Sequence, residues 1–482
     1  MDHRELLLPS HGDPSPPAAA YPRWVLLEQS MWCQDPDART VAYTHTSTGH
    51  PFRISFAFPP PPAVSRPRFD FPGRGGGIEL HPFVIAAHGD SVLVQIQTED
   101  YTTVIFDERC TVDYFVYSAG DAPARPPSLS RLPPCYLTKQ EEGRRRPRER
   151  FMGLPGMTLL RRQEDDETVV AALDARTKEE GPVLEAELCL LRRSGGWELK
   201  RLPVLHDKGK RRELSCWVTD AAAPVGDRFL CWVDYFRGVI FSDVSRESPE
   251  LRYVSLPVKP DLTTYYRDGR GGSSYRSVCA TGGGGMVMSS PARCCGGGPG
   301  TTDCARSHHA FTITMWTLDM NGMTWDKARY AGVIPRVKPE YPTVSLDDPD
   351  VLCLVVHKRK YHREDVDGDR LVRLIEVDTR RMELRSVSRY GFEYLYTGSF
   401  LSCAVSQYFN TLSVRGTPDR RARPHLGRPT HPRVLRLAPP PAASRLRADI
   451  PGCADNGMTS KISTLVIAAH GDSVLLGIET RN

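Results

Sequence analysis

A stretch of eleven residues occurs twice in this chain, and its pattern constrains the fold more than any other feature. Val84–Val94 reads VIAAHGDSVLV and Val466–Leu476 reads VIAAHGDSVLL, so the two copies differ only at the last position. Apolar residues flank His-Gly-Asp-Ser on both sides, as in two short strands joined by a tight turn. Gly89 can adopt the positive φ of such a turn, and Asp90 and Ser91 can hydrogen-bond nearby backbone amides. The stretch therefore predicts a β-hairpin.

A second interpretation makes His88 and Asp90 a catalytic pair. Hydrolysis by such a pair also needs a nucleophile within hydrogen-bonding reach of the histidine, and no matching nucleophile motif is found in the sequence. We therefore predict no catalytic, cofactor-binding or metal-binding residue, and the sequence favours a protein that is not an enzyme.

Short strands recur along the chain. Phe52–Phe58 alternates apolar and polar residues with a period of two, as a half-buried strand does. Further on, a unit of apolar strand, polar turn and second strand recurs at intervals of roughly 50 to 75 residues. The 39 glycines and 41 prolines supply frequent turns. These features predict an all-β fold, a β-propeller of about five to seven irregular blades, with β-sandwiches or a mixed α/β fold as alternatives. The units start at Phe115, Leu188, Val239, Ile313 and Leu374.

Composition changes suggest where the folded part begins and ends. The N-terminal segment is rich in proline and alanine and is predicted to be disordered, and a basic, proline-containing linker follows the all-β part. The last segment repeats an early one, since PPPAASR echoes PPPAVSR ahead of the second hairpin. An isolated hairpin is marginal in water, so we expect this truncated copy not to fold independently. The predicted parts are 1–21 disordered, 22–406 all-β, 407–433 linker, and 434–482 as a duplicate of 53–100.

Charge and cysteine content narrow the partners and the compartment. The 63 basic and 58 acidic residues leave a net charge of +5, too balanced to indicate nucleic acid or an anionic membrane surface. No apolar run reaches the roughly 20 residues of a membrane span, and the N-terminus lacks the apolar run of a secretory signal. The 13 cysteines are odd in number and lack a disulfide-framework spacing. We predict an intracellular protein, cytoplasmic or nuclear, without a membrane or nucleic-acid partner.

Several clusters contain residue types that bind metals. A zinc site is one interpretation of the Cys/His group, but Cys-x-x-Cys is missing, and a glycine-rich loop with free thiols is favoured. The two acidic segments lack the ligand order of an EF-hand and are interpreted as turns. These groups are Cys294, Cys295, Cys304, His308 and His309, and the segments Asp347–Asp350 and Asp365–Asp369.

Three other motifs also favour structural roles. Gly282–Gly285 lacks the Gly-Lys-Ser/Thr ending of a phosphate loop. Arg144–Arg148 is flanked by glutamates, so a solvated loop is favoured over a nuclear-import signal. The tryptophans are interpreted as packing residues whose indole N–H finds a partner. They are Trp217, Trp232, Trp316 and Trp325.

Several segments occur in an informative order along the chain. They are Trp24–Glu28, Ala86–Val94, Asp113–Tyr117, Leu132–Pro134, Trp217–Asp220, Gly226–Gly238, Leu251–Val258 and Tyr341–Val351. Their order resembles that of the plant family called domain of unknown function 1618, which is expanded in grasses. The resemblance covers roughly residues 22–406 and implies an all-β, propeller-like fold. It implies no catalytic residues, because the family has no established activity.

The leading functional hypothesis is a non-enzymatic module that binds a protein partner through loops on a rigid β-scaffold. An enzyme with a site in the central channel is the alternative, since spatial convergence can build a site that sequence does not reveal. A third hypothesis is a partly degenerate duplicate with little selected function.

Overall fold

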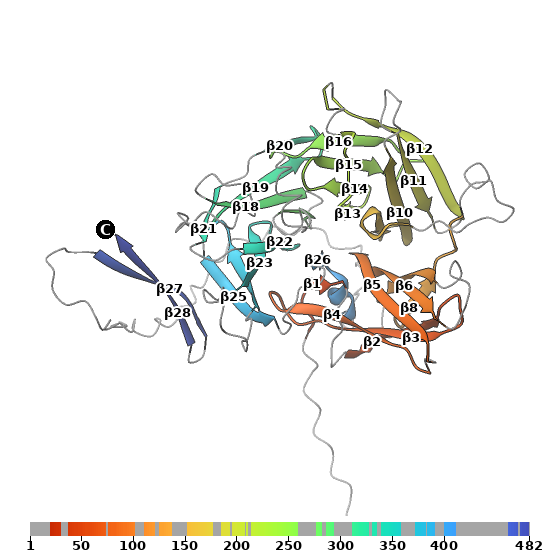
Figure 1. Ribbon diagram of the computed structural model, residues 1–482, viewed down its shortest axis with the longest axis horizontal. Helices are drawn as coiled ribbons and strands as arrows, with labels where there is room; N and C mark the ends of the chain where they lie inside the picture. The colour runs from red at the N-terminus through yellow and green to blue at the C-terminus, as the bar shows by residue number, and fades with distance from the viewer. Residues whose placement is uncertain are drawn as a thin grey trace, which may run out of the picture. The chain divides into compact units, whose positions relative to one another are not determined.

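The computed structural model divides into two compact units, Met1–Leu412 and Ser413–Asn482, which are described separately. Figure 1 shows the chain as a ribbon. The structure describes residues 20–29, 37–73, 76–101, 110–120, 125–136, 152–176, 185–192, 195–207, 209–210, 214–258, 276–281, 286–293, 311–326, 330–334, 339–357, 372–381, 383–390, 400–410, 461–470 and 473–481.

The described part of the first unit is a six-bladed β-propeller (Figure 1). Blades 2, 3, 4 and 6 are antiparallel meanders of four strands in chain order, and blade 5 carries a fifth strand paired to its third. Their strands are β5(Ile78–His88), β6(Ser91–Asp100), β7(Cys110–Ser118) and β8(Ser128–Arg131) in blade 2; β9(Met157–Arg162), β10(Glu167–Arg176), β11(Glu185–Leu191) and β12(Trp197–Leu205) in blade 3; β13(Ala221–Val225), β14(Phe229–Asp234), β15(Gly238–Asp243) and β16(Leu251–Ser255) in blade 4; β17(Ser277–Ala280), β18(Met286–Arg293), β19(Phe311–Asp319), β20(Thr324–Asp326) and β21(Tyr330–Ile334) in blade 5; and β22(Pro339–Val344), β23(Val351–His357), β24(Val372–Asp378) and β25(Glu383–Tyr390) in blade 6.

Blade 1 joins the two ends of the ring. Its innermost strand comes from the C-terminal side of the unit and pairs antiparallel with the first strand of the chain, Leu26 lying opposite Ser402. The next strand, β4, runs parallel to β1. In spatial order the strands are β26(Phe400–Cys403), β1(Val25–Glu28), β4(Val64–Asp70), β3(Pro51–Ala57) and β2(Asp37–His45).

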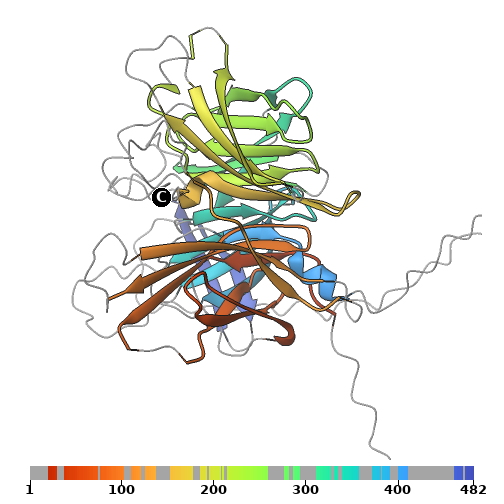
Figure 2. The same cartoon turned by 90° about the vertical axis from the view of Figure 1, so that its right-hand side faces the viewer.

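The first strand of each blade lines the inside of the ring. Each of the six inner strands contacts the inner strand of both neighbouring blades, in the order β5, β9, β13, β17, β22, β26 and back to β5. Blades 3 and 4 are also joined at their outer edges, where β12 pairs parallel with β16. Figure 2 turns blades 2 and 3 toward the viewer.

The hydrophobic core lies between the blades. Six clusters of buried side chains fill the six gaps between neighbouring sheets. In the gap between blades 1 and 2, Phe52 packs edge-on against Phe115 at 4.9 Å and Phe56 against Tyr117 at 5.0 Å. These four side chains are fully buried, and each contributes about 1.5–3 kcal/mol through burial. Both faces of each sheet are therefore covered.

The prediction of an all-β propeller is confirmed. The five predicted repeat units start in β7, β11, β15, β19 and β24, each the third strand of its blade. The sequence repeat did not predict blade 1, because the strands of this blade come from both ends of the unit. In the described part of the chain, none of the helices has the length and hydropathy that a membrane span requires.

The second unit contains one antiparallel hairpin, β27(Lys461–His470) and β28(Ser473–Arg481). Its pairing follows that of β5 and β6, with Val466 opposite Leu476 as Val84 is opposite Val94, and with a bulge after the same valine. The predicted disordered N-terminus and the linker fall almost entirely outside the described residues.

Candidate functional site

The repeated hairpin turns at Gly89 and Asp90, as predicted, and Gly89 has a φ of 58°. Arg161 at the end of β9 reaches this turn from blade 3. Its backbone N–H donates to His88 Nδ1 at 3.0 Å, and its Nε donates to Asp90 Oδ1 at 2.8 Å. The Asp90 carboxylate also accepts from Ser91 Oγ.

At this turn His88 and Asp90 both accept hydrogen bonds from Arg161. Burial lowers the pKa of His88 to about 4, so its imidazole is neutral near pH 7, and its Nδ1 lone pair already accepts the Arg161 N–H. Ser91 is fully buried and donates its hydroxyl to Asp90. The turn is therefore a joint between blades 2 and 3.

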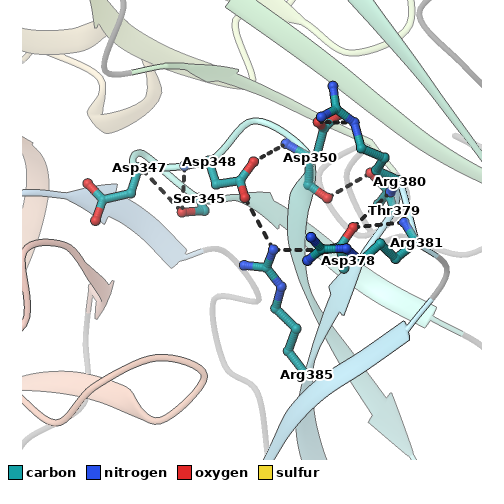
Figure 3. Close-up of polar contacts among 9 residues, drawn as sticks. All are labelled: Ser345, Asp347, Asp348, Asp350, Asp378, Thr379, Arg380, Arg381 and Arg385. Carbon is teal, nitrogen blue, oxygen red and sulfur yellow. Dashed lines mark hydrogen bonds and ion pairs between the residues drawn. The ribbon is translucent and has the colours of Figure 1, made fainter. Parts of the chain in front are cut away.

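The acidic segment at Asp347–Asp350 forms a turn between β22 and β23 (Figure 3). Ser345 Oγ accepts the N–H groups of Asp347 and Asp348 at 3.2 and 3.3 Å. Asp348 Oδ1 in turn accepts the Asp350 N–H at 3.0 Å. The turn interpretation is confirmed.

Arginines neutralise this turn and tie it to the turn between β24 and β25. Figure 3 shows Arg385 reaching between Asp348 and Asp378, with N–O distances of 3.3 and 2.7 Å. Arg380 binds Asp350 at 3.1 Å. Hydrogen bonds from the Arg381 N–H and from Arg385 lower the pKa of Asp378. The cluster stabilises blade 6, and its carboxylates are occupied by cations of the protein itself.

A cavity of about 320 Å³ lies between blades 3 and 4, near the start of their inner strands. Its walls come from the single turn of 3-10 helix η2(Leu154–Gly156), from β10, and from the segment that enters β13. Polar and apolar atoms contribute about equally to the lining, and Met152, Leu173 and Trp217 are its largest side chains. Val218, beside Trp217 in the chain, is 45% exposed.

Two carboxylates hold the Trp217 wall of this cavity. Asp234 Oδ2 accepts the Val218 N–H at 3.0 Å and also binds Arg237 at 2.8 Å. Asp220 Oδ2 accepts the Tyr235 N–H at 2.8 Å. Burial, with a further contribution from the negative charge of Asp234, raises the pKa of Asp220 to about 7. The wall is therefore fixed to the turn between β14 and β15.

The tryptophans pack as predicted, with one difference. Trp232 is fully buried and donates to the Gly156 carbonyl at 2.8 Å, and Trp217 donates to Thr219 Oγ1 at 3.0 Å. Trp316 and Trp325 pack in the gap between blades 4 and 5. Among the described residues, the buried Trp325 Nε1 finds no hydrogen-bond partner, so the prediction of a satisfied indole fails there.

One group of metal-ligating residue types was missed by the sequence reasoning. Glu79, His81 and Glu99 lie on adjacent strands of blade 2. The sequence showed Glu-x-His, but the predicted hairpin arms did not extend to these positions. The other motifs lie outside the described residues, namely Arg144–Arg148, Gly282–Gly285, Cys294, Cys295, Cys304, His308, His309 and Asp365–Asp369.

The fold defines the class of this protein, an all-β six-bladed propeller. Residues 232–353 match the model of a family described as "Protein of unknown function (DUF1618)", from β14 to β23. The predicted resemblance to that family is therefore confirmed for this segment. The curated proteins gave no match.

Solved structures with a similar course include the WD40 domain of SCAP from fission yeast, at 10% identity, covering 74% of this chain and 78% of that one with a TM-score of 0.31. A family 117 glycoside hydrolase from Zobellia galactanivorans has 11% identity, coverages of 67% and 86%, and a TM-score of 0.27. A Bombyx mori GH32 beta-fructofuranosidase has 12% identity, coverages of 65% and 62%, and a TM-score of 0.28. Likenesses this distant carry no argument about activity.

Proposed function

We propose that the propeller is a non-enzymatic module that binds a protein partner, and that the cavity between blades 3 and 4 receives a hydrophobic side chain of that partner. The observation that carries this proposal is the cavity itself. It has room for one or two side chains, its three largest lining side chains are apolar, and such pockets are where anchor residues of an interface bind.

Two further features support the proposal. The wall that carries Trp217 is held by Asp220 and Asp234, so the cavity exists before a partner arrives and little ordering cost remains. Among the described lining residues, Asp174 and Cys189 are the ionisable groups, and neither is accompanied by a lining histidine or lysine. An intracellular location is supported by the eight described cysteines, which form no disulfide with one another.

Site-directed photo-crosslinking in the full-length chain tests this proposal. A benzophenone amino acid at position 218 sits beside the cavity, and one at Tyr43, which is 79% exposed on β2, is the remote control. We expect a protein adduct from position 218 that is reduced at least about tenfold when Ala175→Phe fills the cavity, because an anchor residue contributes more than about 1.4 kcal/mol.

Thermal unfolding of Ala175→Phe checks that the fold survives. Equal adduct yields from positions 218 and 43, or a yield from position 218 that Ala175→Phe does not change, would show that this cavity does not bind the partner.

A further inference from the structure

Glu79, His81 and Glu99 bring three ligand atoms together on blade 2. Those atoms lie within 4.8 Å of one another, with His81 Nε2 at 3.6 Å from Glu79 Oε2 and 4.0 Å from Glu99 Oε1. We propose that these three residues bind a divalent transition-metal ion of the zinc type. This site is separate from the cavity between blades 3 and 4 and goes beyond the proposed function.

The strand geometry explains why the three side chains converge. Glu79 and His81 are two residues apart on β5 and share one face of the sheet. Glu99 lies directly opposite Glu79 on β6. Like charges directly opposite each other destabilise a strand pair, so a cation between the two carboxylates would remove this cost.

Neighbouring side chains orient one of the ligands. Gln97 Nε2 donates to Glu99 Oε1 at 2.7 Å, and Tyr101 Oη donates to Glu99 Oε2. Such hydrogen bonds to ligating carboxylates are a usual feature of metal sites.

The ligand set selects the kind of ion. One imidazole and two carboxylates suit zinc and its neighbours, whereas calcium and magnesium prefer oxygen ligands alone. The side chains of Glu79 and His81 are 57% and 52% exposed. The ion can therefore enter without opening the core, and water can complete its coordination.

The second hairpin supplies a natural control. At the positions equivalent to Glu79, His81 and Glu99 it has Lys461, Ser463 and Arg481, and Lys461 lies opposite Arg481. The triple variant E79K/H81S/E99R carries the residue types of the second copy and should lack the site.

Zinc binding to the full-length chain tests the proposal, measured by competition with a chromophoric chelator after removal of metal. We expect wild type to bind one equivalent more than the triple variant. His81→Ser should weaken this equivalent at least about 100-fold, and Tyr101→Phe about tenfold, since losing an outer-shell partner alone costs about 10–100-fold. His45→Ser, an exposed histidine on β2, should change nothing.

X-ray absorption at the zinc edge gives an independent readout, expected to show one imidazole nitrogen and carboxylate oxygens that disappear in the triple variant. Circular dichroism checks that each variant is folded. Equal zinc stoichiometry and affinity in folded wild type and triple variant would overturn the proposal.

Discussion

A buried ion pair lies where the ring closes, between Glu28 and Arg66. Glu28 on β1 has a side chain 4% exposed, and Arg66 on β4 donates to it through Nε at 2.9 Å. Tyr390 on β25 also donates its hydroxyl to Glu28, which links blade 6 to blade 1. The Arg66 guanidinium lies 5.1 Å from the centre of the Tyr390 ring.

Arg66→Met should leave the Glu28 carboxylate buried with the Tyr390 hydroxyl but without its cation. Removing one partner of a buried pair costs about 3–5 kcal/mol. Because the Arg66 side chain is 19% exposed and water can reach it, we expect the lower value, about 3 kcal/mol. Arg66→Met with Glu28→Gln removes both charges and should cost about 1 kcal/mol, since the amide oxygen can still accept from Tyr390.

Hydrogen exchange reports this change where the ring closes. A loss of about 3 kcal/mol should speed exchange of the β1 amides, Val25–Glu28, by about 150-fold, while β14 in blade 4 serves as the internal reference. The double variant should recover most of the protection. A change below tenfold in Arg66→Met, or a double variant as unprotected as the single one, would refute the idea that an uncompensated charge opens the ring.

Three further predictions follow from packing, titration and the duplicate. Gly156→Ala places a Cβ 2.7 Å from the Leu173 carbonyl oxygen and should destabilise the chain by about 1–3 kcal/mol in urea unfolding, whereas Gly153→Ala meets no atom within 4 Å and should be nearly neutral. Because the pKa of Asp220 is raised to about 7, the folded chain holds this proton more tightly than the unfolded chain. The stability that this group contributes is therefore lost as the pH rises from about 4 to about 7. Asp220→Asn should flatten the dependence of the unfolding midpoint on pH over this range. The sequence prediction that residues 434–482 do not fold independently requires that limited proteolysis cleave them before the propeller, and equal resistance of both would contradict it.

The sequence was sufficient to predict the strands, but it did not predict how they close into a ring. Apolar runs and turn residues are local, so each third strand, such as Leu188 in β11, could be predicted from its neighbours in the chain. The pairing of Leu26 with Ser402 joins segments nearly the whole unit apart, and no local pattern encodes it. The five repeats therefore suggested the fold while the sixth blade went unseen.

The candidate sites could not be predicted from the sequence for the same reason. Trp217 reads as a packing residue, and only the arrangement of blades 3 and 4 places it beside Leu173 around a cavity. Arg161 carries no motif, yet it decides that His88 and Asp90 form a joint. A site built from segments that are distant in the chain can be recognised only once the pairing register of the strands is known.

The two hairpins show which positions serve the fold and which are available for function. In blade 2, Val84 and Val94 pack toward blade 1, while Ile85 and Leu93 pack toward blade 3, so both faces of this hairpin require apolar residues. The repeated stretch is thus a signature of burial between two sheets. The copies also diverge at exposed positions beyond the repeated stretch, such as Glu79 and His81. Divergence there costs the fold little, and this freedom allowed one copy to assemble Glu79, His81 and Glu99 while the other holds two cations and a serine.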